Sequence, residues 1–420
     1  MRFCFTVFAA LLLTISAVQA QHSCTSQEYL QLELQRNPSL QAAITRAEQL
    51  RNQQLFHQET ISGTPDNSAN ALPVIRIPVV IHVLYNKTEQ NISEAQIRSQ
   101  LDVLNTEFRK KHADTSRIPE VFRSLAADTY FEFVLATVNP KGYATNGIVR
   151  KATGTYSFGL DDKMKFTNSG GDDAWDAKRY LNIWVVNLSS GMIGYSSPLG
   201  GPAEKDGVVI SYTAFGTTGK LMAPYTKGRT LVHEIGHWMG LRHIWGDQYC
   251  GNDGVDDTPQ QSQPTRGCPS APVYSNCNGS STAVMYNNYM DLTNDECLNM
   301  FTYGQRDLMR ASFLEGASHF SLVHSDAATA VPIPEPIPVS EVQVTVRAYP
   351  NPARSQVSID ISAIDGLAGK SVIIMNQMGQ KVKQLRLTGM ITTVTISDLA
   401  AGMYFLKVDG VKQPVKVVKQ

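Results

Sequence analysis

The sequence lacks an excess of either charge, long apolar runs after its first residues, and closely spaced cysteine pairs. Its 37 Lys and Arg balance its 37 Asp and Glu, and aromatic residues do not alternate with basic ones, which argues against nucleic-acid binding. No later segment reaches the roughly 18 apolar residues of a membrane helix, so we expect no transmembrane segment in the mature chain. With 42% hydrophobic residues among 420, the chain is predicted to be a soluble globular protein of two or three domains.

Residues 1–20 have the pattern of a secretory signal peptide. Arg2 supplies the positive end, residues 5–17 are apolar, and residues 18–20 fit the small-x-small cleavage rule. The apolar run is too short for a membrane span, and no stop-transfer charges follow it. We therefore expect export through the periplasm and a mature chain that starts near Gln21. A lipoprotein is disfavoured because Cys24 lacks an apolar lead-in.

The cysteines are few, six in all, and export makes them informative. Four of them cluster late in the chain: Cys250, Cys268, Cys277 and Cys297. In an oxidising compartment these should form two disulfides, for which the sequence allows three pairings. A second zinc site is the alternative, although no Cys-x-x-Cys spacing occurs. Cys4 leaves with the signal peptide, which leaves Cys24 as an unpaired thiol.

The stretch from His233 to His243 concentrates chemically active side chains. On a helix, His233 and His237 lie on one face with Glu234 beside them, as a zinc-dependent peptidase requires. Three imidazoles would leave one tetrahedral position of a zinc ion for a water molecule. A straight helix would point His243 away from the other two, but Gly240 can adopt a left-handed conformation, end the helix and bring His243 back.

These residue types predict peptide-bond hydrolysis. Zinc lowers the pKa of its water from 15.7 toward about 7, and Glu234 would accept that proton as the hydroxide attacks a peptide carbonyl. Glu234 would then protonate the leaving amine. The alternative is a buried helix whose histidines make ordinary hydrogen bonds. The matching positions of Gly240 and His243 favour the metal site.

The pattern His-Glu-x-x-His-x-x-Gly-x-x-His, continued by Ile244-Trp245-Gly246-Asp247, resembles the pappalysin family of metzincin metallopeptidases. The resemblance implies a methionine turn beneath the zinc. The segment Asn288-Tyr289-Met290-Asp291 matches it, with Met290 as the apolar floor of the site; an ordinary core methionine is the alternative. The resemblance also favours the disulfides Cys250–Cys277 and Cys268–Cys297.

One position departs from the family pattern. The relatives have a tyrosine two residues after that methionine, which helps to stabilise the tetrahedral intermediate, whereas this chain has Leu292. Either Tyr289 or Tyr303 compensates, or the enzyme relies on zinc and Glu234 for the oxyanion.

Residues 21–72 are predicted to be a pro-segment. Residues 25–59 have helical patterning, and a stretch rich in Gly, Pro, Asn and Ser follows at 62–71. The thiolate of Cys24 could occupy the water's position on zinc and keep the enzyme latent. The family resemblance implies such a latency cysteine. The alternative is a solvent-exposed leftover thiol.

Residues 73–325 are expected to form an α+β catalytic domain of metzincin type, with a mixed sheet and a zinc-binding helix. Predicted strands are Val74–Leu84, Phe131–Val138 and Leu181–Val186, and Ile92–Phe108 is a predicted helix that Ser93 opens. By analogy to metzincins, Gly207–Ser211 is expected to be an edge strand along which an extended substrate pairs its backbone.

A loop between the third histidine and the methionine turn is rich in oxygen ligands. Asp253, Asp256, Asp257 and Thr258 suit a structural calcium ion in an extracellular medium. An ion-free turn rich in Asp and Gly is the alternative. The family resemblance favours calcium, with Asp253 and Thr258 as the best-matching positions.

Two carboxylates just beyond the methionine turn predict substrate preference. Asp295 and Glu296 lie where the pocket for the residue after the scissile bond should be, and a carboxylate at its base would select Arg or Lys. The resemblance supports Arg. The alternative is a solvated acidic pair beside Cys297.

The C-terminal part follows a proline-rich linker at 326–342, in which prolines alternate at 332, 334, 336 and 338. Residues 343–420 alternate in period two, which predicts a small all-β sandwich. Tyr349-Pro350-Asn351-Pro352-Ala353, Gly402–Val408 and Lys416–Gln420 resemble the C-terminal sorting domain of the type IX secretion system. This implies contact with that machinery; a binding or adhesion sandwich is the alternative.

These patterns together predict a secreted, zymogenic zinc endopeptidase that acts on proteins or peptides and is released or attached to the cell surface. The rival hypothesis is a surface-binding or adhesive protein with a degenerate peptidase domain, which Leu292 would allow.

Overall fold

The chain divides into two compact units, Met1–Pro334 and Glu335–Gln420. The computed structural model describes residues 23–62, 72–189, 191–270, 272–277, 279–335, 346–362, 366–411 and 413–420. The predicted signal peptide and part of the predicted linker therefore lie outside the described residues. No helix in the described part of the chain is long and apolar enough to cross a membrane.

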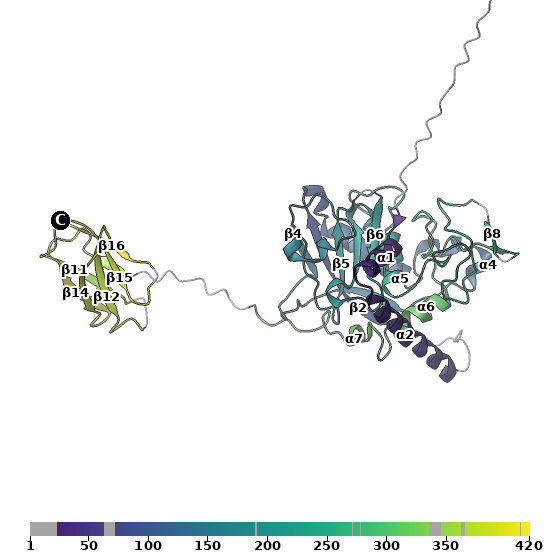
Figure 1. The fold of residues 1–420 in the computed structure, drawn as a ribbon, viewed down its shortest axis with the longest axis horizontal. Helices are drawn as coiled ribbons and strands as arrows, with labels where there is room; N and C mark the ends of the chain where they lie inside the picture. Colours follow the sequence, from purple (N-terminus) through teal and green to yellow (C-terminus); the bar gives the residue numbers. More distant parts are fainter. Residues whose placement is uncertain are drawn as a thin grey trace, which may run out of the picture. The chain divides into compact units, whose positions relative to one another are not determined.

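The first unit is built on a mixed sheet whose longest strand, β2 (Ile75–Tyr85), lies near one end of the strand order (Figure 1). Parallel to β2 run β3 (Phe131–Leu135), β4 (Ile148–Ala152) and β5 (Leu181–Val186), and β7 (Val208–Ser211) is parallel to β5. β6 (Met192–Ser196) is antiparallel to β7, and β1 (Ser23–Cys24) is parallel to β6. Every residue of β5 is buried, as expected for a strand covered on both faces.

Helices pack on this sheet through one apolar face. In α3 (Glu94–Glu107), Ile97 and Leu104 are buried, and Ser93 accepts a hydrogen bond from the Gln96 amide, which confirms the predicted N-cap. The remaining helices and a hairpin of the unit are α1 (Ser26–Arg36), α2 (Leu40–Ser62), α4 (Glu120–Arg123), α5 (Arg229–Trp238), α6 (Tyr303–Ala311), α7 (Phe320–Val323), β8 (Tyr274–Cys277) and β9 (Ser280–Ala283). The predicted α+β class is confirmed.

Two details of the predicted organisation are wrong. The segment Gly207–Ser211 is not an edge strand, because β7 lies between β5 and β6; the edge belongs to β6, which β1 covers. The first unit also extends past residue 325. The Ala327 carbonyl accepts hydrogen bonds from the Thr137 and Val138 amides, and the Ile333 amide donates to Gly142. Neither the order of strands nor these backbone pairings leaves a local signal in sequence.

The second unit is an all-β domain of two antiparallel sheets, as predicted. One sheet has the order β10 (Arg347–Tyr349), β11 (Gln356–Asp360) and β14 (Ile391–Thr395). The other has the order β13 (Lys381–Arg386), β12 (Ser371–Asn376), β15 (Gly402–Val408) and β16 (Val415–Lys419). Alternate apolar residues from both sheets, among them Val357, Ile359, Val372 and Leu406, form one buried core.

Candidate active site

The helix α5 carries His233, Glu234 and His237 and ends at Trp238. Gly240 then has φ +96°, in the left-handed region, and the Leu241 amide returns to the Gly236 carbonyl at 3.0 Å. A side chain at 240 would be strained in this conformation. The chain reverses at this point, and the reversal brings His243 back toward the helix.

The three imidazoles meet at one point. Nε2 of His237 lies 3.0 Å from Nε2 of His233 and 3.1 Å from Nε2 of His243. Burial and the neighbouring His243 lower the pKa of His233 to about 3, and the same causes lower the pKa of His237. His233 and His237 are therefore neutral near pH 7, the state that binds metal. A tetrahedral zinc ion with bonds of about 2.0–2.1 Å needs nitrogens at about this separation.

The opposite ring nitrogens are all hydrogen-bonded, which fixes the orientation of each ring. Nδ1 of His233 lies 2.6 Å from the Tyr289 carbonyl, and Nδ1 of His237 lies 2.9 Å from the Leu241 carbonyl. Nδ1 of His243 pairs with the carboxylate of Asp247. Such partners set the tautomer that leaves Nε2 free for a metal.

Met290 lies directly beneath this part of α5. A Cβ added at Gly236 would come within 2.6 Å of the Met290 sulfur, and the Met290 side chain is fully buried. The Met290 carbonyl also accepts a hydrogen bond from the Ile244 amide at 3.1 Å. Glycine at 236 therefore permits the close approach of the methionine turn to the histidine helix, which is the position predicted for Met290.

Glu234 is fully buried beside the three histidines. Its Oε2 accepts a hydrogen bond from the Ser26 hydroxyl at 2.9 Å, while its Oε1 has no hydrogen-bond partner among the described residues. Burial raises the pKa of Glu234 to about 8. A Cβ at Gly194 would stand 3.0 Å from the Glu234 side chain, so a glycine on β6 makes room for this carboxylate. An unpaired buried oxygen at this place fits a water or metal centre.

Cys24 lies in the same site. Its sulfur is 3.7 Å from Glu234 Oε2, and together with the three histidines it forms a group whose possible ligand atoms all lie within 4.8 Å of one another. Backbone pairing holds it there, because β1 lies along β6 and the Thr25 amide donates to the Gly194 carbonyl at 3.0 Å. The thiol is buried, not an exposed leftover.

A small cavity of about 30 Å³ adjoins His233, Glu234 and Cys24. Asp295 lines it and is fully enclosed, and burial raises the pKa of Asp295 to about 6. Its Oδ2 accepts hydrogen bonds from the Lys227 and Arg229 amides at the start of α5, at 2.9 and 3.3 Å.

Glu296 does not line this cavity, contrary to the prediction. Its side chain is exposed and lies beside the Cys268–Cys297 disulfide. The two neighbouring carboxylates point in different directions, because adjacent residues in this turn do not share a face. Only Asp295 remains a candidate for the specificity pocket.

Neither tyrosine predicted to compensate for Leu292 reaches the site. The Tyr289 hydroxyl is buried against the carboxylate of Glu107, and Tyr289 does not line the small cavity. Tyr303, at the start of α6, lies under the guanidinium of Arg306, whose Cζ is 4.9 Å from the ring centroid. Leu292 itself lines the small cavity, so its position in the site matches the family pattern although its chemistry does not.

A larger cavity of about 270 Å³ adjoins His237 and His243. It is lined by Leu30, Leu34 and Ile44 from the predicted pro-segment, and by His237, His243 and Asp247. The helices α1 and α2 thus form one wall of a space that opens onto the candidate zinc ligands.

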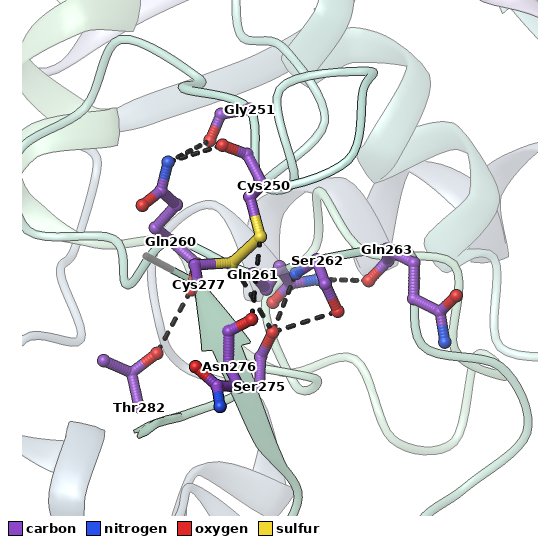
Figure 2. Close-up of a disulfide and its surroundings, with 10 residues drawn as sticks. All are labelled: Cys250, Gly251, Gln260, Gln261, Ser262, Gln263, Ser275, Asn276, Cys277 and Thr282. Atoms are coloured by element: carbon purple, nitrogen blue, oxygen red, sulfur yellow. Dashed lines mark hydrogen bonds between the residues drawn. A yellow bond between two sulfur atoms is a disulfide. The ribbon is translucent and has the colours of Figure 1, made fainter. Parts of the chain in front are cut away.

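The loop after His243 is held by a disulfide between Cys250 and Cys277, with an S–S distance of 2.13 Å (Figure 2). Figure 2 also shows the Gln260 amide donating to the carbonyls of Cys250 and Gly251. A second disulfide joins Cys268 and Cys297. These are the pairings that the family resemblance favours.

The oxygen ligands predicted for calcium are occupied by hydrogen bonds within the protein. Asp253 accepts from the Thr258 hydroxyl and the Val255 amide. Asp257 accepts from the Thr302 hydroxyl and the Gly304 amide at the start of α6. The side chain of Asp256 is exposed. The two inner carboxylates therefore brace the loop and the helix.

The comparisons with known proteins agree with this geometry. The family described as pregnancy-associated plasma protein-A matches residues 167–314, and the secretion system C-terminal sorting domain matches residues 347–420. An extracellular metalloprotease of Arthroderma benhamiae is 30% identical over 246 residues, which cover 56% of this chain and 71% of that protein. The chain belongs to the pappalysin family of metallopeptidases.

Solved structures support the same assignment. Mature mirolysin of Tannerella forsythia in complex with a cleaved peptide is 45% identical, with a TM-score of 0.60, and the match covers 62% of this chain and all of that one. A mutant of promirolysin is 40% identical with a TM-score of 0.64, over 74% of this chain and 99% of that one. As a pappalysin this protein is a metalloendopeptidase, the family implies zinc, and the sorting domain directs it to the cell surface or exterior.

Three residues of the site were not predicted from sequence. Asp247 orients His243, Ser26 donates to Glu234, and Gly194 leaves space for Glu234. Asp247 stands four residues after His243, a spacing that could have been noticed as a local carboxylate–histidine pair. Gly194 lies on β6, and Ser26 begins α1 just after β1; the pairing of β1 with β6 brings both to Glu234 and has no counterpart in local sequence.

We expect Gly236→Ala to destabilise the first unit by about 1–3 kcal/mol, because the new methyl group would overlap the Met290 sulfur. Thermal unfolding measures this. Adding Met290→Ala in the same chain removes the overlap and should recover part of the loss relative to Met290→Ala alone. If Gly236→Ala is as harmful in both backgrounds, contact with Met290 is not the reason for glycine at this position.

Proposed function

We propose that this pappalysin is a latent zinc endopeptidase in which His233, His237 and His243 hold the metal, Glu234 is the general base, and Cys24 blocks the site. The observation that carries the proposal is the meeting of three imidazoles beside the buried carboxylate of Glu234, with Nε2 of His237 3.0 Å from that of His233 and 3.1 Å from that of His243. A degenerate, purely adhesive domain would have no reason to keep this arrangement.

The residues present fit a zinc ion. All three Nε2 atoms face one another, all three Nδ1 atoms are held by other groups, and Glu234 Oε1 is buried without a partner among the described residues. Bound zinc supplies Lewis-acid chemistry: it makes a water acidic and polarises the peptide carbonyl.

Glu234 is proposed to carry the proton. It is adjacent to the histidines in the site and is not one of the three imidazole ligands, so its carboxylate is available to accept a proton from the attacking water and return it to the leaving amine. Its enclosure by β6 at Gly194 keeps it in one position and excludes bulk water, which strengthens electrostatic interactions inside the site.

Latency is proposed to come from the segment that precedes β2. The strand β1 covers the edge of β6, where an extended substrate would pair its backbone, and the Cys24 sulfur lies among the candidate zinc ligands. A thiolate in this place would take the coordination position that the reaction needs for water. Promirolysin, a relative named as a pro-form, matches over most of this chain.

Substrate preference is proposed to depend on Asp295. A buried carboxylate lining the small cavity beside His233 and Glu234 favours a cationic side chain, which would bind through a charge-assisted hydrogen bond. Arg or Lys next to the scissile bond fits this chemistry. Calcium binding by the loop from Asp253 to Thr258 stays a prediction. In this structure the carboxylates of Asp253 and Asp257 accept hydrogen bonds from protein groups.

Glu234→Ala is expected to reduce kcat by about 10²-fold or more, because the general base is lost. Bound zinc, measured by metal analysis, should stay near one per chain, since the three histidines remain. Glu296→Gln, a change at an exposed carboxylate, is the control and should leave kcat unaltered. Full activity in Glu234→Ala would remove this residue from the mechanism.

Cys24→Ala should shorten latency. The chain loses the sulfur that faces the candidate zinc site, so autolysis of the purified full chain, followed by electrophoresis over time, should begin earlier than in the parent. Gln31→Ala, at an exposed position of α1, provides the matched control. Equal time courses for the parent and Cys24→Ala would show that the thiol does not maintain latency.

Two peptides that differ only in having Arg or Gln after the scissile bond are compared. Asp295→Asn should lower kcat/KM for the Arg peptide about 10- to 100-fold more than for the Gln peptide, because a hydrogen bond between charged groups contributes a free energy of this size. The ratio of the two values is the readout, because Asp295 also holds the start of α5 and both rates can fall together. An unaltered ratio would mean that Asp295 does not select the cation.

A further inference from the structure

The predicted pro-segment makes a second polar contact with the catalytic unit, separate from Cys24. Tyr29 and Glu33 lie four residues apart on α1, which places them on one face of the helix. Tyr29 is 1% exposed and Glu33 4% exposed. An acidic residue is rarely so buried without partners. Arg36 of the same helix pairs with Glu33 Oε1 at 2.9 Å, and the surface that receives α1 supplies a partner for Oε2.

That surface consists of Asp162, Lys165 and Lys205. The Tyr29 hydroxyl donates to Asp162 Oδ2 at 2.8 Å, and Lys205 Nζ lies 2.6 Å from Glu33 Oε2. Both lysine ammonium groups are 3.0 Å from the Asp162 carboxylate. Two carboxylates, Asp162 and the Glu33 of α1, thus share the two ammonium groups, and the Arg36 guanidinium of α1 lies 2.9 Å from the other oxygen of Glu33.

Aromatic rings complete the site. The Lys165 ammonium lies 5.1 Å from the ring centroid of Tyr29, 5.3 Å from that of Tyr195 and 5.5 Å from that of Trp184. The rings of Tyr29 and Tyr195 are 4.6 Å apart. Lys165 has no exposed surface, and a cation desolvated among ring faces interacts strongly with them. Tyr29 belongs to the same buried apolar cluster as Trp184 and Tyr195.

The charge states of the site agree with this geometry. Burial and the neighbouring Asp162 raise the pKa of Tyr29, so its phenol stays protonated and donates. Burial acts to raise the pKa of Asp162, but Lys165 and Lys205 outweigh it and the pKa is lowered. Asp206, held by Ser197 and Trp238, adds a further attraction for Lys165. The receiving groups are thus braced by the catalytic unit itself.

We propose that Asp162, Lys165 and Lys205, with the rings of Trp184 and Tyr195, form a recognition site for a phenol and a carboxylate one helical turn apart. We name it the phenol–carboxylate site. In the full chain α1 fills it with Tyr29 and Glu33. This part of the proposal rests on the proposed function: once processing removes α1, the phenol–carboxylate site is empty. It then binds a released α1 helix from solution, including one from a second copy of this chain.

Different residues of the pro-segment anchor it to the catalytic unit and block the candidate zinc site. Cys24 and Ser26 act at the candidate zinc centre, whereas Tyr29 and Glu33 act on a different surface of the unit. Loss of the thiol alone would then leave α1 attached. Groups that do not share a partner are expected to contribute additively to the attachment.

The first test is amide hydrogen exchange of residues 26–36 in the full chain carrying Glu234→Gln, a background that needs no peptidase activity. Tyr29→Phe removes only the hydroxyl, and Glu33→Gln only the charge; each should speed exchange of these amides about 10-fold. Gln31→Ala and Gln35→Ala, exposed on the same helix, should have no such effect. Exchange that is unaltered by Tyr29→Phe and Glu33→Gln would overturn the proposal, whether or not Glu234 is catalytic.

The second test uses a synthetic peptide of residues 23–36 with Cys24→Ala and the processed enzyme, and measures binding by fluorescence anisotropy. The expected result is saturable binding that Tyr29→Phe or Glu33→Gln in the peptide weakens about 10-fold each. Lys205→Gln in the enzyme should weaken it similarly, and Gln31→Ala in the peptide should not. Equal affinity of all these peptides, or no binding of any, would show that the site does not recognise the phenol and the carboxylate.

Discussion

The site depends on one constraint, the meeting of three imidazole nitrogens at a point outside the end of a helix. Two of the rings follow from helical periodicity, but the third requires the chain to reverse within a few residues. Gly240 allows this reversal because it has φ +96°, and Gly236 allows Met290 to press against the helix from below. The carbonyls of Tyr289 and Leu241 and the carboxylate of Asp247 then hold the rings from behind. Each of these contacts limits a rotation that would otherwise separate the three nitrogens.

The edge of the sheet also contacts this site. Its edge strand β6 brings Gly194 against Glu234, and the short β1 adds to that edge and delivers Cys24 and Ser26 to the same carboxylate. Asp295 ties the turn after Met290 to the first amides of α5. The helix, the methionine turn and the sheet edge are therefore braced against one another. The α1 helix continues from β1 and inserts Tyr29 into the apolar cluster beneath β5 and β6, so the segment that covers the site is also packed as part of the domain.

Much of the site could be predicted because the candidate zinc ligands are close in sequence. His233, Glu234, His237, Gly240 and His243 lie within one helix and one turn, where periodicity and glycine conformation decide geometry. Cys24 was identified by cysteine counting, and the fold class by the order of apolar segments. The errors concern relations across the chain. The pattern of Gly207–Ser211 predicts an edge strand, but β7 is internal. Of the two adjacent carboxylates, Asp295 lines the small cavity and Glu296 does not. The Tyr289 hydroxyl pairs with Glu107 and not with the position expected for the oxyanion.

The amino-acid order by itself thus determined which imidazoles, carboxylate and thiol are the candidates for the proposed chemistry, and that a sorting domain of alternating apolar strands lies at the C-terminus. The tertiary structure alone decided which strand forms the open edge, which carboxylate faces the cavity, and that Asp162, Lys165 and Lys205 converge under α1. The physical reason is the range of the interactions. Helical register and turn conformation are fixed by neighbours along the chain, whereas strand order and buried ion pairs are fixed by residues far apart in sequence, whose partners are chosen only when the whole core packs.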